Sequence, residues 1–321
     1  MSAVDPSSPD NLSTASNALL NQFAQAYLDQ QRREKRWRWF WRIVWMGVAF
    51  SMIWATLQNV PSAKSQSSPH TALVEIRGEI AADTEANADN LLAALRSAFE
   101  DAGAQAVVLR INSPGGSPVQ AGLVNDEVRR LKALHKKKVY AVCEEMCASA
   151  AYYIAVSADQ IFVDKASMVG SIGVLMDGFG FTGIMDKVGV ERRLMTAGTN
   201  KGMLDPFSPR NPRHEEFAQA MLDQIHQQFI GVVKAGRGDR LKPTPETFSG
   251  LFWTGQQAIE MGLADKLGSL DFVAREVVKA EDIIDYTRRE NVAERLVKRF
   301  GAAMGVGAAK ALATPATVQL R

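Results

Sequence analysis

The chain has 321 residues, of which 46% are hydrophobic and 22% charged, as in an ordinary globular protein that can bury a substantial core. Its formal net charge of +2 argues against a polyanionic partner such as nucleic acid. Its two cysteines cannot form a structural zinc site by themselves.

The N-terminal 38 residues combine a polar stretch with a basic cluster. Residues 1–30 are rich in Ser, Asn, Gln and Ala, which favours a disordered or partly helical arm. Six basic residues follow between positions 32 and 42, against a single acid, Glu34. A nucleic-acid patch is one interpretation of this cluster, but the apolar segment behind it favours the flank of a membrane span.

That apolar segment, residues 39–60, is predicted to be a transmembrane signal anchor. Positions 39–57 carry one charge, Arg42, and as a helix would span about 28 Å, close to the hydrocarbon thickness of a bilayer. Because the basic residues precede the span, residues 1–38 are expected in the cytoplasm and everything after the span across the membrane. A buried core helix and a cleaved signal peptide are the alternatives.

Residues 61–70 read as a flexible linker, and a globular α/β domain is expected at residues 71–280. Apolar strands alternate there with helices, which predicts a parallel sheet covered on both faces. The expected strands are 73–76, 106–111, 139–143, 161–163 and 193–196, and the expected helices are 87–102, 119–134, 148–156 and 215–233. Residues 281–321 are expected to hold an amphipathic helix at 292–300 and a low-complexity tail.

Cys143 and Cys147 are expected to lie within one strand-to-helix turn. We interpret them as small buried core residues, while a disulfide in an oxidising compartment is the alternative.

Two adjacent glycines, Gly115 and Gly116, stand at a predicted strand-to-helix turn, with Pro118 in the first helical turn. Glycines let the backbone approach a ligand closely and direct its amides toward one point, so the turn suits a phosphate or an oxyanion. A plain turn is the alternative, and no Gly-Lys-Ser/Thr follows that would make a nucleotide-binding loop.

Ser149 is predicted at the start of a helix, and Lys201 follows 52 residues later, after the strand expected at 193–196. A serine hydroxyl becomes a good nucleophile only when a base takes its proton, and a neutral lysine amine in a desolvated site can do so. Ser149 and Lys201 are therefore a candidate catalytic dyad, and Ser171 could hold the amine in place. A capping serine, a turn serine and a solvated lysine are the alternatives.

Together these segments resemble the signal peptide peptidase A family of membrane-bound serine proteases, in its short, single-repeat form. The resemblance covers about 200 residues. Its motifs are Asn112-Ser113-Pro114-Gly115-Gly116, Ala148-Ser149-Ala150-Ala151-Tyr152-Tyr153, Gly170-Ser171-Ile172-Gly173-Val174, Thr196-Ala197-Gly198 with Lys201, Trp253-Thr254-Gly255-Gln256-Gln257-Ala258 and Gly262-Leu263-Ala264-Asp265. Each motif alone also occurs in the wider Clp protease/crotonase superfamily, so the resemblance implies a Clp protease/crotonase-like α/β fold with parallel sheet layers and flanking helices.

The resemblance further implies a role for each candidate residue. Ser149 would be the nucleophile, Lys201 the general base and Ser171 the residue that orients the lysine. The amides of Gly116 and Ala150 would form the oxyanion hole, with no metal or other cofactor. The chain has Ala150 and Ala151 where the family has glycines, which is acceptable unless position 150 needs a positive φ.

These observations predict an endopeptidase that degrades membrane-derived peptides such as remnant signal peptides. It would be anchored in the bacterial inner membrane, with its N-terminus in the cytoplasm and its protease domain on the periplasmic side. By resemblance, a homo-oligomer is expected. A crotonase-type acyl-CoA enzyme and a catalytically silent membrane scaffold are the alternatives.

Overall fold

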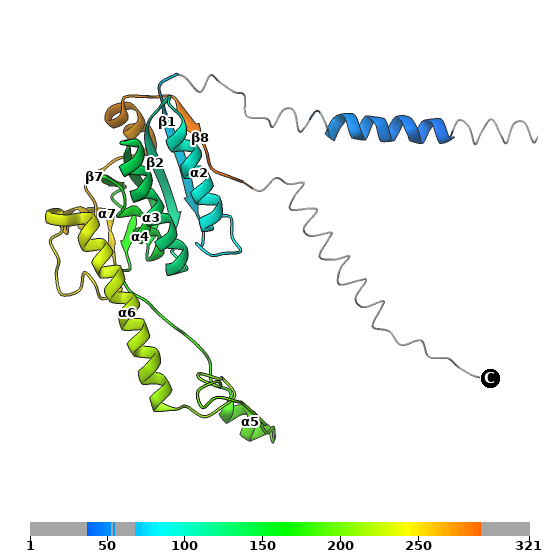
Figure 1. Cartoon of the computed structure of the whole chain (residues 1–321), viewed down its shortest axis with the longest axis vertical. Helices are drawn as coiled ribbons and strands as arrows, with labels where there is room; N and C mark the ends of the chain where they lie inside the picture. The colour runs from blue at the N-terminus through cyan, green and yellow to red at the C-terminus, as the bar shows by residue number, and fades with distance from the viewer. Residues whose placement is uncertain (1–36, 53, 55–67, 290–321) are drawn as a thin grey trace, which may run out of the picture. The chain divides into compact units, whose positions relative to one another are not determined.

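The computed structural model describes residues 37–52, 54 and 68–289, and the chain divides into two compact units, Met1–Lys64 and Ser65–Arg321. In the first unit, residues 37–52 and 54 are helical (Figure 1). No helix in the described part of the chain is long and apolar enough to cross a membrane. Residues 53 and 55–60 of the predicted anchor lie outside the described residues, so the transmembrane helix stays a prediction.

The second unit is built on a sheet with the strand order β6-β5-β3-β2-β1-β8, to which β4 and β7 add a branch beside β3. All pairings in this sheet are parallel except that of β5 with β6. The strands are β1 (His70–Arg77), β2 (Ala104–Ser113), β3 (Lys138–Ala148), β4 (Gln160–Val163), β5 (Met168–Gly170), β6 (Phe252–Thr254), β7 (Lys266–Leu267) and β8 (Ile283–Asp285).

Helices cover both faces of this sheet, which explains why its central strands are apolar along almost their whole length. Val107, Leu109 and Ile111 of β2 belong to the main core, whereas Val108 points to a second cluster that includes Val273. The helices are α2 (Ala88–Glu100), α3 (Pro118–His135), α4 (Ala150–Ala155), α5 (Thr182–Val188), α6 (Pro212–Arg237), α7 (Gly255–Glu260) and α8 (Leu270–Phe272), with the 3-10 turn η1 (Gly238–Arg240) and the π-helix η2 (Val273–Val278).

In Figure 1, α2, α3 and α4 lie on one side of the sheet. The second cluster, which includes residues of η2, covers the other side. This arrangement confirms the Clp protease/crotonase-like α/β fold with flanking helices.

Strand β3 changes partner along its length. Ile111 of β2 is opposite Cys143, and Ser113 of β2 is opposite Cys147. Between these two pairs β3 therefore has two more residues than β2, which is a bulge. The first half of β3 therefore pairs with β4 and its last three residues pair with β5. Both cysteines lie within β3 rather than in the turn after it, and both are buried free thiols.

The structure also differs from the sequence-based expectations at two places in the domain. Residues 193–196 form no strand; they belong to an exposed segment, residues 174–211, which we call the arm. The arm contains α5 and lies beyond the N-terminal end of α6, away from the sheet (Figure 1). Beyond the expected end at residue 280, β8 pairs with β1, so the domain continues at least through Asp285. The helix expected at 292–300 and the tail lie outside the described residues.

A buried ion pair anchors α6 to the rest of the domain. The guanidinium of Arg237, 1% exposed, donates two hydrogen bonds to the Asp265 carboxylate, at 2.8 and 2.9 Å, and a third to the Gly262 carbonyl. In the same segment, the Leu263 carbonyl accepts a hydrogen bond from the buried Tyr152 hydroxyl of α4. Residues 262–265 therefore hold both α4 and the C-terminal end of α6.

Asp265→Asn should lower the free energy of unfolding by about 3 kcal/mol, because it leaves the buried Arg237 charge without a counter-ion. Burial raises the pKa of Asp265, but the hydrogen bonds and charge of Arg237 outweigh it, so the net pKa is lowered. The stabilisation is then complete above about pH 4 and is lost as the pH falls through the lowered pKa. Urea unfolding at pH 7 and at pH 3 should show a smaller difference between wild type and variant at pH 3.

The control is Glu215→Gln, which removes a carboxylate of the same helix from its exposed pair with Arg210 of the arm and should change stability much less. Equal losses for the two variants would show that the buried pair does not anchor α6.

Candidate active site

Three parallel strands end at the same edge of the sheet and bring the candidate residues together. Ala148, the last residue of β3, is opposite Gly170, the last residue of β5. Ser149 and Ser171, which follow them, therefore emerge side by side. On the other side of β3, Cys147 is opposite Ser113, so the glycine turn after β2 emerges beside the same strand end.

Ser149 forms the whole connection between β3 and α4. Its backbone has φ 55° and ψ −124°, a sparsely populated conformation for a residue with a side chain, and strain of this kind is often found at functional sites. Its N–H donates to the Gly170 carbonyl at 2.8 Å, and its carbonyl accepts from the Tyr153 N–H at 3.0 Å. Its side chain does not cap α4. Within the described residues the hydroxyl has no hydrogen-bond partner, so it is available for chemistry.

The glycine turn touches the backbone of Ser149 directly. Gly115 has φ +107°, and a Cβ placed there would lie 2.7 Å from the Ser149 Cβ and 2.8 Å from the Ala148 carbonyl oxygen. Gly116 has φ +144° and lies against Ile80, whose backbone bonds Gly115 and Ser117 on either side of it. A side chain at Gly115 would push the turn away from Ser149, and one at Gly116 would push it away from Ile80.

Two backbone amides beside Ser149 are suited to bind an oxyanion. The Ile80 N–H donates to the Gly115 carbonyl, and the Ser117 N–H donates to the Ile80 carbonyl. The Ser149 N–H donates to the Gly170 carbonyl. The amides of Gly116 and Ala150 make no such bond within the described part of the chain, and both residues line the same cavity as Ser149. Ala150 is the first residue of α4 and has no positive φ, so alanine is acceptable at this position.

Ser171 is held in a second strained turn. Its φ is 51°, its N–H donates to the Leu251 carbonyl at 2.8 Å, and its carbonyl accepts from Gly173 at 2.9 Å. His226 of α6 adds a 3.0 Å hydrogen bond from its ring to the Ile172 carbonyl. The Ser171 hydroxyl has no partner in the region the structure describes. The turn thus fixes the backbone and leaves the hydroxyl available.

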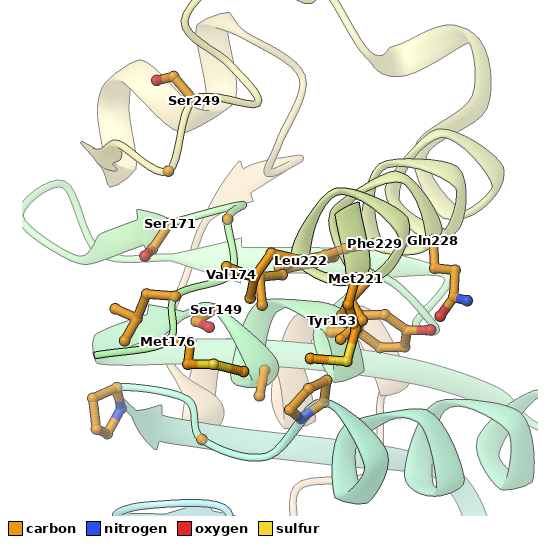
Figure 2. Close-up of a pocket in the computed structure, with 18 of the residues that line it drawn as sticks. Ser149, Tyr153, Ser171, Val174, Met176, Met221, Leu222, Gln228, Phe229 and Ser249 are labelled. Atoms are coloured by element: carbon orange, nitrogen blue, oxygen red, sulfur yellow. The ribbon is translucent and has the colours of Figure 1, made fainter. Parts of the chain in front are cut away.

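A cavity of about 700 Å³ opens over these groups and is lined by Ser149, Ser171, Gly116 and Ala150. Its walls are mostly apolar and come from α6 and from the residues after Ser171; Figure 2 shows Met221, Leu222 and Phe229 of α6 near Ser149, with Val174 and Met176. Such a cavity accommodates apolar side chains next to the Ser149 hydroxyl. The sequence had identified 215–233 as a helix through its apolar positions, but not as a wall of the site.

Lys201 is not in this cavity. It is exposed in a turn of the arm, where its N–H donates to the Gly198 carbonyl. The strand expected before it is absent, so nothing in the sheet directs it toward Ser149. Of the five predicted site residues, the structure brings together Ser149, Ser171, Gly116 and Ala150, and leaves the proposed base outside. Within one described chain, the cavity therefore has a candidate nucleophile and two candidate oxyanion donors, and no lysine among the described residues lines it.

Comparisons with known proteins point to one family. Residues 132–283 match the family described as Peptidase family S49. "Putative protease slr0021" of Synechocystis sp. is 32% identical over 206 residues, covering 64% of this chain and 72% of that protein. "Putative signal peptide peptidase SppA" of Enterococcus faecium is 29% identical over 201 residues, 63% of this chain and 58% of that protein.

A further relative carries a different name. The "Na(+)/H(+) antiporter NhaA" of Brucella melitensis is 48% identical over 176 residues, which are 55% of this chain but 24% of that protein. The chain therefore spans about a quarter of the length of that relative. The relative's name describes a much larger molecule.

Gly115→Ala should reduce the reactivity of Ser149 at least about tenfold, because the new methyl group would overlap the Ser149 Cβ at a φ that favours glycine. Labelling by a serine-directed fluorophosphonate measures this, with Ser149→Ala as the unlabelled reference. Gly122→Ala, in the interior of α3 with nothing within 4 Å, is the control and should raise stability by roughly 0.5–1 kcal/mol. Full labelling of Gly115→Ala would contradict the tight contact.

Proposed function

The chain belongs to peptidase family S49, the family of signal peptide peptidase A, and we propose that it is a serine endopeptidase with Ser149 as its nucleophile. The observation that carries this proposal is the position of Ser149. Its hydroxyl has no partner among the described residues, and it belongs to a strained turn in an apolar-walled cavity that Gly116 and Ala150 also line. Acyl transfer needs this combination of an accessible nucleophile and fixed hydrogen-bond donors for the developing oxyanion.

In the proposed reaction, the neutral amine of Lys201 accepts the proton of the Ser149 hydroxyl as its oxygen bonds to the scissile carbonyl carbon. The Gly116 and Ala150 amides stabilise the resulting oxyanion, and removing one such donor typically costs about 3 kcal/mol. The protonated lysine then gives its proton to the leaving amine as the C–N bond breaks. Water hydrolyses the acyl-enzyme and regenerates the hydroxyl. Ser171 orients the lysine amine through its free hydroxyl.

Lys201 must reach the cavity from the arm, and the surface of the arm supports an assembly of several copies. The arm is held together by its own contacts, such as the stacked rings of Phe181 and Phe207 and the Arg192–Asp205 ion pair. Its surface outside the cavity exposes large apolar side chains: Phe179, Ile184, Val188, Val190 and Met195. Apolar patches of this kind mark interaction sites. We propose that the arm docks on a neighbouring copy and brings Lys201 to a Ser149 hydroxyl in a homo-oligomer.

The apolar cavity favours peptides from membrane segments, such as remnant signal peptides, as substrates. The predicted anchor at residues 39–60 would hold the domain at the bilayer surface, where such peptides are released. With residues 1–38 in the cytoplasm, the protease domain lies on the periplasmic side of the bacterial inner membrane. This location is part of the proposal.

Ser149→Ala should abolish hydrolysis of a quenched fluorescent peptide, with a loss of at least about 1,000-fold in kcat, because no nucleophile remains. Lys201→Met should cause a similar loss, since the hydroxyl would keep its proton. Lys187→Met, which removes another arm lysine, is the control and should retain most of the activity. Wild-type rates in either dyad variant would contradict its assigned role.

A mixture of the two inactive variants tests where the base comes from. If Lys201 acts on a neighbouring copy, Ser149→Ala and Lys201→Met chains regain activity when they are mixed and allowed to exchange subunits. No recovery in mixed oligomers would place the base in the same chain as the serine.

The rate should rise from acidic to alkaline pH, because only the neutral Lys201 amine can accept the serine proton. Initial rates at saturating peptide between about pH 6 and 9 measure this. A flat profile over this range would argue against a lysine base.

A further inference from the structure

The catalytic cavity carries a single carboxylate on its lining. Of the described residues that line it, Glu79 is charged, and the others are apolar or neutral. Glu79 lies on the loop between β1 and α2. It has no role in the proposed catalytic reaction. In a cavity with apolar walls, one fixed charge has a large influence on which ligand is accepted.

The backbone around Glu79 is hydrogen-bonded to the glycine turn and to the end of β2 before it. The Gly78 N–H donates to the Asn112 carbonyl at 3.0 Å and the Ile80 N–H donates to the Gly115 carbonyl at 2.8 Å. The Glu79 carbonyl itself accepts a hydrogen bond from the Thr84 hydroxyl at 2.8 Å. The backbone of Glu79 is therefore held on both sides, at a fixed position relative to Gly116, while its side chain is exposed.

The Glu79 carboxylate has no cation within ion-pairing distance among the described residues, whereas several acids of the domain are paired. Glu75, Glu127, Glu144 and Asp265, for example, each contact an arginine. An unpaired carboxylate beside a substrate cavity is free to pair with a positive charge on the substrate. A neutral or acidic substrate gains nothing there, or is repelled.

We propose that Glu79 is a specificity-determining residue that selects peptides with a lysine or arginine side chain near the scissile bond, next to an apolar residue held by the cavity. The inference rests on the proposed peptidase function and narrows its substrate class. Peptides from the junction of a basic and an apolar stretch have this pattern, and secretory signal peptides contain such a junction. The apolar walls bind one part of the substrate and the carboxylate binds the other.

The test uses the full chain in detergent and a set of quenched fluorescent peptides with one apolar anchor residue. A single lysine is moved through the positions on either side of the anchor, and norleucine replaces it in the matched peptides. Wild type should cleave the best lysine peptide with a kcat/KM about two- to fivefold above its norleucine partner, as an accessible ion pair allows. Added salt should reduce this ratio.

Glu79→Gln should bring the lysine-to-norleucine ratio close to one while leaving cleavage of the norleucine peptide within about twofold, and Glu79→Lys should favour a glutamate peptide instead. Asp83→Asn is the matched control: it removes a charge from the same loop outside the cavity lining and should leave the ratio unchanged. An unchanged ratio in Glu79→Gln would overturn the proposal. An equal loss for all peptides would also overturn it, because it would show a structural role.

A measurement of peptide binding tests the selectivity of Glu79 independently of the proposed peptidase activity. Fluorescence anisotropy of the labelled lysine and norleucine peptides on the Ser149→Ala chain requires no hydrolysis. Tighter binding of the lysine peptide that disappears in the double variant Ser149→Ala/Glu79→Gln supports the selection even if the wild type cleaves nothing. Equal binding of the two peptides to Ser149→Ala would overturn it even if the wild type is an active peptidase.

Discussion

The parallel pairing of β3 with both β2 and β5 is the constraint on which the site depends. Because Ala148 is opposite Gly170 and Cys147 is opposite Ser113, three chain segments must leave the sheet at one edge. The bulge in β3 between residues 143 and 147 makes this possible, since it frees the end of the strand from β4 and turns it to β5. The strained backbone at Ser149 and Ser171 is the local result, and the surrounding hydrogen bonds stabilise it.

Much of the domain could be predicted from the sequence, because parallel strands buried on both faces leave continuous apolar runs. The glycine turn, Ser149 and Ser171 were also predictable, since each follows such a run. The prediction of a strand before Lys201 was wrong. The apolar residues of that segment, such as Leu194 and Met195, are exposed on the arm instead of buried in the sheet. A single sequence does not distinguish apolar residues of a core from those of an exposed surface. Arg237 and Glu79 were missed for a related reason: nothing local indicates that one charge is buried against Asp265 and that the other lines a cavity.

The rigid and the exposed parts of the domain have different roles in the proposed enzyme. Residues 262–265 fix α4 and the C-terminal end of α6 through Tyr152 and Arg237, so the nucleophile and one cavity wall are held to the core. Among the residues that the structure describes, no hydrogen bond or ion pair joins the arm that carries Lys201 to the sheet. This division fits an enzyme that becomes competent only on assembly, which would limit cleavage by single copies.

Helix α6 takes part in both of these regions. Its middle supplies Met221, Leu222 and Ile225 to the cavity, and its N-terminal end continues into the arm. In the proposed oligomer, a molecule that fills the cavity and a neighbouring copy that contacts the arm would therefore act on the same helix. Thermodynamic linkage makes their effects reciprocal: whatever factor assembly adds to substrate affinity, substrate adds to the affinity between subunits. Cooperative dependence of the rate on substrate concentration is the natural outcome of such a shared element.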